Sequence, residues 1–363
     1  MRITMVIGNL GGGGAERVCA NLANAWAASG RDVTLLTALP GACVYQVDPR
    51  VQWRRLDRGG EITPRSLAPV LRVLRADRCT NLRFQAGLLT LLRDAILATE
   101  PDVVISHLTM TNIRVLAAMQ ETGIPVIACE HTDVTRVPMG GWGAERTALY
   151  RRARTVVATH EVCAGWLARH GARAVAIPNP LLPPVGTFPG RRAGRPRAVM
   201  LTRLAAEKRP GMAVRAFART ELRDWELHIH GDGPLRAQTE RLIEEWAPGR
   251  VLLHPFSSEP YRILREADLF VSASMVEGFG NAIWEALACA VPVVAMDCGA
   301  SVRSLVRHGL DGLLVRPDTT TALMEALASL MSDDARRAQL QPSVVERFPF
   351  QAAMAKWEEV LAA

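Results

Sequence analysis

The sequence predicts an α/β protein built from two Rossmann-like domains, each with a doubly wound parallel sheet, that face a cleft. Three observations support this prediction. Apolar segments of strand length alternate with helix-like segments along the chain. Many of these segments are continuous runs of Val, Ile and Leu, which is typical of strands buried on both faces. The length of 363 residues also exceeds what one hydrophobic core usually holds.

Six strands are expected in each half of the chain. The first six cover residues 3–7, 32–37, 102–106, 125–129, 154–158 and 174–177. The other six cover residues 197–201, 225–230, 250–253, 268–272, 292–295 and 312–315. Residues 350–361 form a final amphipathic helix with Trp357 on its apolar side. This alternation is typical of right-handed βαβ units.

A proline-rich stretch separates the two halves. Residues 178–197 contain six of the 22 prolines, and such a stretch sustains neither a helix nor a central strand. We therefore expect an N-terminal domain over residues 1–178, a linker over 179–196, a C-terminal domain over 197–346 and a last helix in 347–363. Ligands of such domains bind in the cleft, at the carboxyl ends of the strands.

Composition argues against several classes of protein. No apolar run reaches the roughly 18 residues that span a bilayer, and the residues before the first glycines are too few for a signal peptide. We therefore expect a cytoplasmic protein. The seven cysteines include no CxxC pair, which argues against disulfides and a zinc site. Only two of the 43 basic residues are lysines, Lys208 and Lys356, so a lysine within a motif is notable.

Most of the positive charge lies in one segment. Residues 50–99 contain ten arginines and four acidic residues, a local excess of +6 within a formal net charge of +7. An anionic partner explains such a segment, and so does a solvated helical face. Residues 71–75 and 88–93 combine leucines with arginines, as in helices that lie on an anionic bilayer. Nucleic acid is disfavoured, because aromatic residues do not interleave with the arginines.

A glycine-rich loop, residues 8–17, follows the first strand and precedes a helix. Its central residues are Gly12, Gly13 and Gly14. Glycines let a ligand approach the backbone, and the start of a helix offers free N–H groups. A flexible turn is the alternative interpretation. A dinucleotide site is disfavoured, because no acidic residue ends the second strand.

The strongest motif leaves a buried strand at residue 272 and enters a helix. Gly278 and Gly280 permit an open backbone whose N–H groups can hold a diphosphate. Glu277 precedes the helix, and Glu285 lies inside it, on the same face as Asn281. Carboxylates accept hydrogen bonds from the vicinal hydroxyls of ribose or hexose, so the pattern suits a nucleotide sugar. The alternative is a helix cap with a surface glutamate.

Two cations follow the first strand of the second half. Arg203 and Lys208 could bind a diphosphate, one as a planar fork and the other as a point charge. Such cations would make a metal ion unnecessary. Asp133 and Asp232 are isolated, and a single carboxylate is a poor magnesium site, so no metal is expected. An Arg–Lys pair alone is also common on protein surfaces.

Two further motifs follow predicted strands. Residues 230–235 form a turn in which Asp232 lines a nucleotide or only shapes the turn. Residues 128–133 form a polar cluster at the end of a first-half strand. His131 in this cluster could bond a sugar hydroxyl or a reacting phosphate, or it is structural.

These motifs together resemble glycosyltransferase family four, a family of retaining GT-B glycosyltransferases. The stretch from Glu277 to Glu285 resembles its E-x7-E signature. Residues 12–17, 177–180, 203–208 and 231–234 fall where the family has its other motifs, although Thr202 stands where many members have glycine. The resemblance implies an N-terminal acceptor-binding domain, a C-terminal nucleotide-sugar-binding domain and a last helix that crosses back onto the first domain.

The resemblance also implies a role for each candidate residue. Arg203 and Lys208 would hold the diphosphate, Glu277 the 3- or 4-hydroxyl of the sugar, and Glu285 the ribose hydroxyls. His131 would lie at the 6-hydroxyl, and the loop of glycines would close over the reaction centre. Glu16 either contacts the acceptor or only holds its helix. Further donor contacts would come from Asp232, Gly278, Phe279, Gly280, Asn281 and Ala282.

The reaction implied by the resemblance is a metal-independent transfer with retention, in which the leaving phosphate takes the proton of the acceptor. We expect a UDP-linked hexose or N-acetylhexosamine as donor and a polyprenyl-diphosphate-linked glycan as acceptor. The protein would lie at the inner face of the cell membrane, bound through residues 50–99. The alternatives are GDP-mannose as donor, a soluble acceptor, and a non-catalytic subunit that binds nucleotide sugars.

Overall fold

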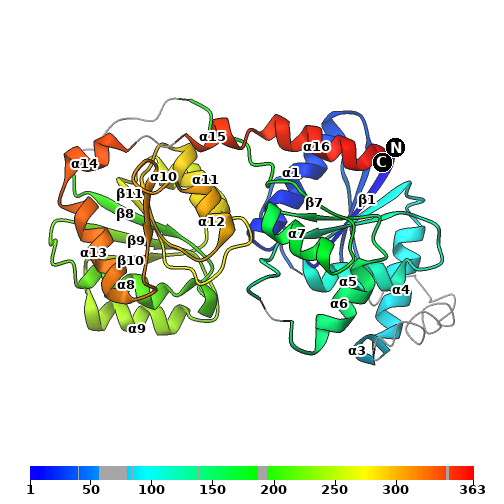
Figure 1. Ribbon diagram of the computed structural model, residues 1–363, viewed down its shortest axis with the longest axis horizontal. Helices are drawn as coiled ribbons and strands as arrows, with labels where there is room; N and C mark the ends of the chain where they lie inside the picture. Colours follow the sequence, from blue (N-terminus) through cyan, green and yellow to red (C-terminus); the bar gives the residue numbers. More distant parts are fainter. Residues whose placement is uncertain (40, 57–79, 84, 138, 187–193, 341–342) are drawn as a thin grey trace. The chain divides into compact units, whose positions relative to one another are not determined.

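The computed structural model of the chain (Figure 1) describes residues 1–39, 41–56, 80–83, 85–137, 139–186, 194–340 and 343–363. It divides into two compact units. The first consists of Met1–Pro180 and Gln351–Ala363, and the second of Leu181–Phe350. Each unit is built around its own parallel sheet, which confirms the predicted fold class.

The first unit contains a seven-stranded parallel sheet in the order β3-β2-β1-β4-β5-β6-β7. Its strands are β1 (Arg2–Ile7), β2 (Asp32–Thr37), β3 (Gln52–Arg55), β4 (Val103–His107), β5 (Val126–Glu130), β6 (Thr155–Ala158) and β7 (Ala174–Ala176). Its helices are α1 (Gly14–Ala28), α3 (Thr80–Arg83), α4 (Ala86–Leu97), α5 (Thr109–Ala118), α6 (Gly143–Tyr150), α7 (Glu161–Arg169) and α16 (Phe350–Ala362), with the 3₁₀ turn η1 (Gly140–Trp142).

Strand β3 is the one element of this sheet that the sequence analysis did not predict. It lies at the sheet edge and reads Gln-Trp-Arg-Arg, with only Trp53 half-buried. An edge strand with one solvated face needs no apolar run. The periodicity that identifies buried strands is therefore missing from it.

The second unit contains a six-stranded parallel sheet in the order β10-β9-β8-β11-β12-β13. Its strands are β8 (Arg197–Leu201), β9 (Glu226–His230), β10 (Val251–His254), β11 (Leu269–Ser272), β12 (Val293–Met296) and β13 (Gly312–Val315). Its helices are α8 (Pro210–Ala218), α9 (Arg236–Trp246), α10 (Pro260–Leu264), α11 (Asn281–Ala288), α12 (Ala300–Leu305), α13 (Thr320–Met331), α14 (Asp334–Gln339) and α15 (Val344–Arg347), with the 3₁₀ turn η2 (Ala206–Lys208).

Both faces of each sheet are covered, which explains the continuous apolar runs. In the first unit Val6 and Leu36 pack into one core cluster together with residues of α4 and α5. Their neighbours Met5 and Leu35 are also fully buried and, because side chains alternate along a strand, point to the opposite face. Transfer of this apolar surface out of water is the main force that holds the sheet and helices together.

Each sheet has a topological switch point, where the strand order reverses. It lies between β1 and β4 in the first unit and between β8 and β11 in the second. Loops at the carboxyl ends of the two central strands diverge to opposite faces at this point, and the space between them is where open α/β sheets bind ligands. The candidate site of each unit is therefore expected at these strand ends.

The last helix packs on the first unit, as expected. Trp357 of α16 is 3% exposed and meets Trp26 of α1 edge to face, with ring centroids 5.5 Å apart and an interplanar angle of 83°. Arg31 forms an ion pair with Glu358, and the Lys356 ammonium donates to the carbonyl of Ala176 at 3.4 Å. Among the described residues, no helix is both long and apolar enough to cross a bilayer.

We expect Trp357→Ala to lower the free energy of unfolding of the first unit by about 3–5 kcal/mol, because truncating a buried aromatic side chain leaves a cavity. The measurement is a denaturant titration that follows the first unit. Glu359→Ala is the matched control, since Glu359 lies on the exposed face of the same helix. Equal unfolding midpoints for the two variants would show that α16 does not stabilise the unit.

Candidate functional site

An ion pair joins the two loops at the switch point of the second unit. The Lys208 ammonium donates to Glu277 Oε1 at 2.7 Å, and the two side chains are 21% and 16% exposed. The hydroxyl of Ser274 donates to the same carboxylate oxygen at 2.7 Å. Lys208 belongs to the loop after β8 and Glu277 to the loop after β11, so the structure brings these two predicted residues together.

Further hydrogen bonds, in which backbone carbonyls accept, join the same two loops. Arg209 adopts a left-handed conformation with φ of 49°, and its Nε donates to the carbonyl of Ala273 at 2.7 Å. The amide of Met275 donates to the carbonyl of Glu207 at 2.8 Å. Arg209 also pairs with Asp318 at 2.7 Å. Arg209 stands directly beside Lys208, but no sequence motif indicates this role.

Arg203, the other predicted cation, pairs with a neighbouring glutamate. Its guanidinium pairs with Glu207 at 2.9 Å, four residues along, and its side chain is 66% exposed. The structure therefore does not bring Arg203 into the contact between Lys208 and Glu277. Exposed pairs of this kind contribute little to stability, so the guanidinium can exchange Glu207 for a stronger anion at small cost.

The glycines around Asp232 are required by the backbone of the neighbouring loop. Gly231 and Gly233 have φ of 156° and 154°. A Cβ at Gly231 would overlap the carbonyl oxygen of Thr202, and one at Gly233 would lie 2.5 Å from that of Leu204. The exposed Asp232 accepts a hydrogen bond from the amide of Gly233 at 2.7 Å. This turn therefore supports the β8 loop from its other side.

Helix α11 begins beside the ion pair. Gly280 precedes the helix with φ of 96°, and Gly278, Asn281 and Ala282 are half-buried. Phe279 is buried and meets Phe348 edge to face at 5.9 Å, so its side chain belongs to the core. Glu285 lies within the helix and is 3% exposed. The N–H groups at the helix start, together with Lys208, form a surface suited to an anion.

The glycine loop of the first unit leads directly into α1. Gly12 has φ of 106°, Gly13 caps the helix and Gly14 begins it. The Tyr45 hydroxyl donates to the carbonyl of Gly13 at 2.8 Å. A Cβ at Gly13 would lie 2.8 Å from the carboxyl carbon of Glu16. The Glu16 carboxylate thus covers the positive end of the helix dipole, which favours its structural role.

His131 pairs with a second histidine at the switch point of the first unit. His131 Nε2 lies 3.0 Å from Nδ1 of His107, the last residue of β4, and the rings stack with centroids 5.3 Å apart. Burial lowers the pKa of His131 to about 4. Burial, followed by the effect of His131, lowers the pKa of His107 well below its usual value. Both rings are therefore neutral at neutral pH.

The other ring nitrogen of each histidine is available to a ligand. His131 Nδ1 and His107 Nε2 are buried and have no hydrogen-bond partner among the described residues. Buried polar atoms are costly when unpaired, so a hydroxyl that reaches them would be stabilised. The sequence motifs do not single out His107. Its only signal is a histidine directly after the third predicted strand, residues 102–106, beside the switch point.

A buried network fixes the end of β5, where His131 begins the next loop. Glu130 accepts hydrogen bonds from the hydroxyls of Thr109 at 2.8 Å and Tyr150 at 2.7 Å, and from the amide of Thr132 at 3.0 Å. Burial raises the pKa of its carboxyl. Leu108, which follows His107, has φ of 75° and ψ of 140°. Strained backbone of this kind tends to occur at functional sites.

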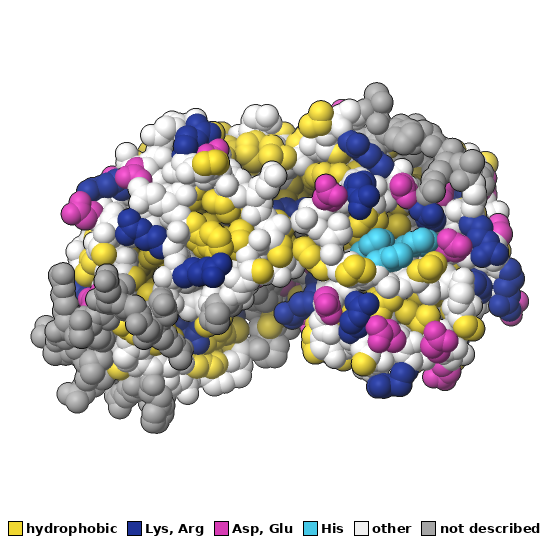
Figure 2. Space-filling model, turned by 180° about the vertical axis from the view of Figure 1, so that it is seen from behind, with side chains coloured by type: hydrophobic (Ala, Val, Ile, Leu, Met, Phe, Trp, Pro, Cys, Tyr) yellow, Lys and Arg dark blue, Asp and Glu magenta, His cyan; other side chains and the backbone are white. Residues whose placement is uncertain are grey.

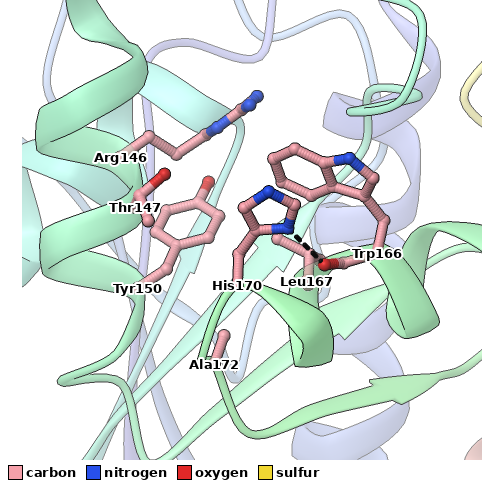
Figure 3. A pocket seen from close by; sticks show the side chains of 7 residues that line it. All are labelled: Arg146, Thr147, Tyr150, Trp166, Leu167, His170 and Ala172. Carbon is pink, nitrogen blue, oxygen red and sulfur yellow. Dashed lines mark hydrogen bonds between the residues drawn. The ribbon is translucent and has the colours of Figure 1, made fainter.

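A small pocket of the first unit lies between α6 and α7 (Figure 3). His170 stacks on Trp166 with ring centroids 3.7 Å apart, and its Nδ1 lies 2.8 Å from the carbonyl of Trp166. The guanidinium of Arg146 lies 5.3 Å from the Trp166 ring centroid. The pocket has a volume of about 10 Å³, which is enough for one water molecule. It therefore cannot hold a sugar or a nucleotide.

The basic segment is only partly described. Residues 57–79 lie outside the described residues, and with them the predicted basic helix at 71–75. In α4, Leu89 and Leu92 are buried in the core of the first unit, and Arg93 donates to the carbonyls of Ala118 and Gln120, both at 2.8 Å. The expectation that residues 88–93 lie on a bilayer is therefore wrong, because packing on α5 buries their apolar side.

Among the described residues, two groups of three side chains lie close enough to hold a metal ion. One consists of Asp133, His160 and Cys163, which are buried in the first unit. The other consists of His228, His230 and His254, which are half-buried in the second unit. Neither group contains Lys208 or Glu277.

Two family models match the chain, one in each half. The model described as "Glycosyltransferase Family 4" matches residues 12–181, and the model described as "Glycosyl transferases group 1" matches residues 195–333. Together they include the glycine loop, His131, and both loops of the Lys208–Glu277 pair.

Curated relatives of the chain include a glycosyltransferase and a phosphotransferase. An α-1,4-N-acetyl-D-galactosaminyltransferase of Campylobacter jejuni, named for a glycan carried on PP-undecaprenol, is 25% identical over 96% of this chain and 93% of its own length. An exopolysaccharide phosphotransferase of Streptomyces coelicolor is 28% identical over 78% of this chain but only 30% of its own. Three of the curated relatives are matched over only 24% to 37% of their length.

The fold is also that of known structures. A mutant of TarM from S. aureus, crystallised with fondaparinux, α-GlcNAc-glycerol and UDP, superposes with a TM-score of 0.79. The match covers 100% of both chains at 13% sequence identity. At this identity the similarity shows the GT-B fold alone.

We expect the His131 ring to remain neutral until the pH falls to about 4, whereas the ring titrates near 6.5 in the unfolded chain. Between these values only the unfolded chain takes up the proton, so stability falls as the pH falls through this window. From pH 7 to pH 5, wild type should lose about 2 kcal/mol more unfolding free energy than His131→Gln.

Denaturant titrations of the first unit at the two pH values measure this difference. NMR titration of the ring, assigned from the signal lost in His131→Gln, locates the midpoint directly. His308→Gln is the control, since His308 is exposed and belongs to the second unit. A ring midpoint near 6.5 would contradict the neutral His107–His131 pair.

Proposed function

Because this chain is a GT-B glycosyltransferase of glycosyltransferase family four, we propose that it is a retaining hexosyltransferase with a nucleotide diphosphate sugar as donor. The transferred sugar is a hexose or N-acetylhexosamine, and UDP is the favoured nucleotide. UDP is bound in the related structures of TarM and HepE. The acceptor in this proposal is a lipid-linked glycan of surface polysaccharide or glycan assembly.

The Lys208–Glu277 pair carries this proposal. Without a donor, the ammonium and the carboxylate neutralise each other at 2.7 Å. A diphosphate at the start of α11 would compete for Lys208 and recruit Arg203 from Glu207. Glu277, released from its ion pair, would then accept hydrogen bonds from the hydroxyls of the sugar. One binding event would thus place both the leaving group and the transferred ring.

The chemistry then depends on stabilising the departing diphosphate. Lys208, the recruited Arg203 and the N–H groups of the start of α11 would act on the charge that develops on the diphosphate as its bond to the sugar breaks. In this account they replace a divalent metal ion. The leaving phosphate oxygen takes the proton of the acceptor hydroxyl on the same face of the sugar, so no side chain acts as general base and the configuration is retained.

The remaining predicted residues take supporting roles. Glu285, nearly buried in α11, would accept the ribose hydroxyls, and hydrogen bonds in such surroundings are strong because water does not compete. The unpartnered nitrogens of His131 and His107 would bond the 6-hydroxyl of the sugar. The loop of Gly12 to Gly14 would cover the reaction centre and exclude water.

The acceptor is proposed from the chemistry of the relatives. The full-length relative from C. jejuni is named for an undecaprenol-diphosphate glycan, and other relatives are named for poly(glycerol-phosphate) and poly(ribitol-phosphate) polymers. A lipid-linked acceptor requires access to a membrane surface. Arg54 and Arg55 on the exposed strand β3 would supply positive charge for it. This contact would hold the protein at the inner face of the cell membrane.

Three alternatives remain open. The first is GDP-mannose as the donor, the second is a soluble metabolite as the acceptor, and the third is a chain that binds nucleotide sugars without catalysis. The polar contacts between Lys208, Ser274 and Glu277 favour catalysis, because a mere binding protein needs no paired charge beside the transferred sugar.

We expect Lys208→Met and Glu277→Gln each to lower the rate of sugar transfer by about 10²–10³-fold, the usual loss when one group that stabilises developing charge is removed. The assay measures nucleotide release from UDP-, GDP- and ADP-linked sugars with a lipid-linked glycan acceptor. Lys356→Met is the matched control, because Lys356 is the other lysine of the chain and lies in α16.

Nucleotide binding is measured in parallel by thermal shift, since a ligand of the folded state raises the melting temperature. UDP should raise it more than GDP or ADP. Equal transfer rates for Lys208→Met and Lys356→Met would refute the role of the ion pair. A shift with UDP but no release from any donor would instead support the non-catalytic alternative.

We expect the protein to float with vesicles that contain anionic lipid and not with neutral vesicles. The double variant Arg54→Glu, Arg55→Glu should float several-fold less, because each basic residue near an anionic surface contributes about 1 kcal/mol. Arg173→Glu, Arg223→Glu is the control, since both arginines are exposed but lie outside the basic segment. Failure of wild type to float would remove the membrane contact from the proposal.

A further inference from the structure

Three histidines share one face at the edge of the second sheet. His228 and His230 are two residues apart on β9, so their side chains point to the same side. His254 ends β10 and pairs in register with His230. Figure 2 shows histidine side chains gathered in one patch on the surface of the molecule. The patch is therefore open to solvent and to small ions.

The nitrogen atoms of these rings already converge. His228 Nδ1 lies 3.1 Å from His254 Nε2, and one nitrogen from each of the three rings lies within 4.8 Å of the others. A tetrahedral ion with bonds of about 2.0–2.1 Å separates its ligand nitrogens by roughly 3.3 Å. Two of the ligands are thus near the required spacing. The third, His230, stacks on His254 with ring centroids 4.3 Å apart.

A carboxylate orients the first of these rings. His228 Nε2 lies 3.1 Å from Glu226 Oε2 on the same strand, which leaves Nδ1 directed toward His254. A carboxylate behind a ligating imidazole fixes its tautomer and orientation and strengthens it as a ligand. Arg197 and Arg262 add positive charge nearby. Affinity must therefore come from the imidazole lone pairs, which favours a transition metal over calcium or magnesium.

We propose that His228, His230 and His254 bind one Zn²⁺ ion, with Glu226 as the positioning residue and a fourth position open to water. The ion would join the carboxyl ends of β9 and β10. The amide of Gly231 donates to the carbonyl of His254 at 3.2 Å, so the same ends carry the Gly231–Gly233 turn that supports the loop of Lys208. The site contains neither Lys208 nor Glu277 and is separate from the proposed sugar transfer.

The test must separate this site from the buried group of Asp133, His160 and Cys163, which could also take up zinc. Cys163→Ser removes the thiolate ligand of that group. The full-length protein, stripped with a chelator and exchanged into metal-free buffer, is therefore titrated in the Cys163→Ser background. Zn²⁺ alone is added in competition with a chromophoric chelator, and Co²⁺ reports the ligands by its visible absorption.

We expect one ion bound per chain, and a Co²⁺ spectrum of nitrogen ligands without thiolate charge transfer. His230→Gln and His254→Gln should abolish binding at the concentrations that saturate the parent. Glu226→Gln should weaken it by about 10–100-fold, as for other residues behind a metal ligand. His308→Gln is the matched control and should bind as the parent does. Zn²⁺ should raise the melting temperature of the parent and the control only.

Two results would overturn the proposal. One is the absence of zinc binding in the Cys163→Ser protein. The other is equal affinity in His254→Gln and His308→Gln. Circular dichroism of each variant in metal-free buffer shows whether the variant is folded. The Co²⁺ spectrum of the parent tests the ligand set without any histidine substitution, so a folding defect in a variant cannot affect it.

Discussion

The ion pair between Lys208 and Glu277 is the contact on which the candidate site depends. It joins loops that leave neighbouring strands, β8 and β11, at the point where the strand order reverses. A partly buried ion pair is stable only when hydrogen bonds compensate for the lost water. Ser274 supplies one at the carboxylate, and Ser301 donates to the backbone carbonyl of Glu277 at 2.8 Å. These contacts fix the positions of both charged side chains at the switch point.

The two units use the same geometric principle with different chemistry. In the second unit the switch point carries a charged pair, suited to a diphosphate. In the first unit it carries a neutral pair, His107 and His131, whose charged forms are suppressed by burial. Neutral imidazoles can bond hydroxyl groups without attracting phosphate. The difference between a charged pair and a neutral pair thus follows from partial exposure at one switch point and burial at the other.

Glycine serves a different purpose in each of the loops. Gly231 is required because a side chain would overlap the Thr202 carbonyl. Gly13 leaves room for the Glu16 carboxylate over the start of α1, and Gly280 supplies the left-handed residue from which α11 begins. Only the last of these precedes the helix that begins beside the Lys208–Glu277 pair. Glycine in this chain therefore marks close backbone packing as well as the start of a helix.

The sequence by itself determined the fold class, because strands buried on both faces must be continuously apolar and their alternation with helices leaves few other topologies. It also singled out Lys208, Glu277 and the glycine turns as candidates, since each lies in a loop that follows a predicted strand. It could not show that Arg203 pairs with Glu207, that Leu89 and Leu92 face the core, or that His107 meets His131.

Only the tertiary structure decided those points, and it alone brought His254 to His228 and His230. Such contacts join residues from different strands or helices. The separation of two such residues along the chain does not predict the distance between them in space. Local pattern records which face of an element is buried. Which side chains meet there is decided by the order in which the strands are laid side by side.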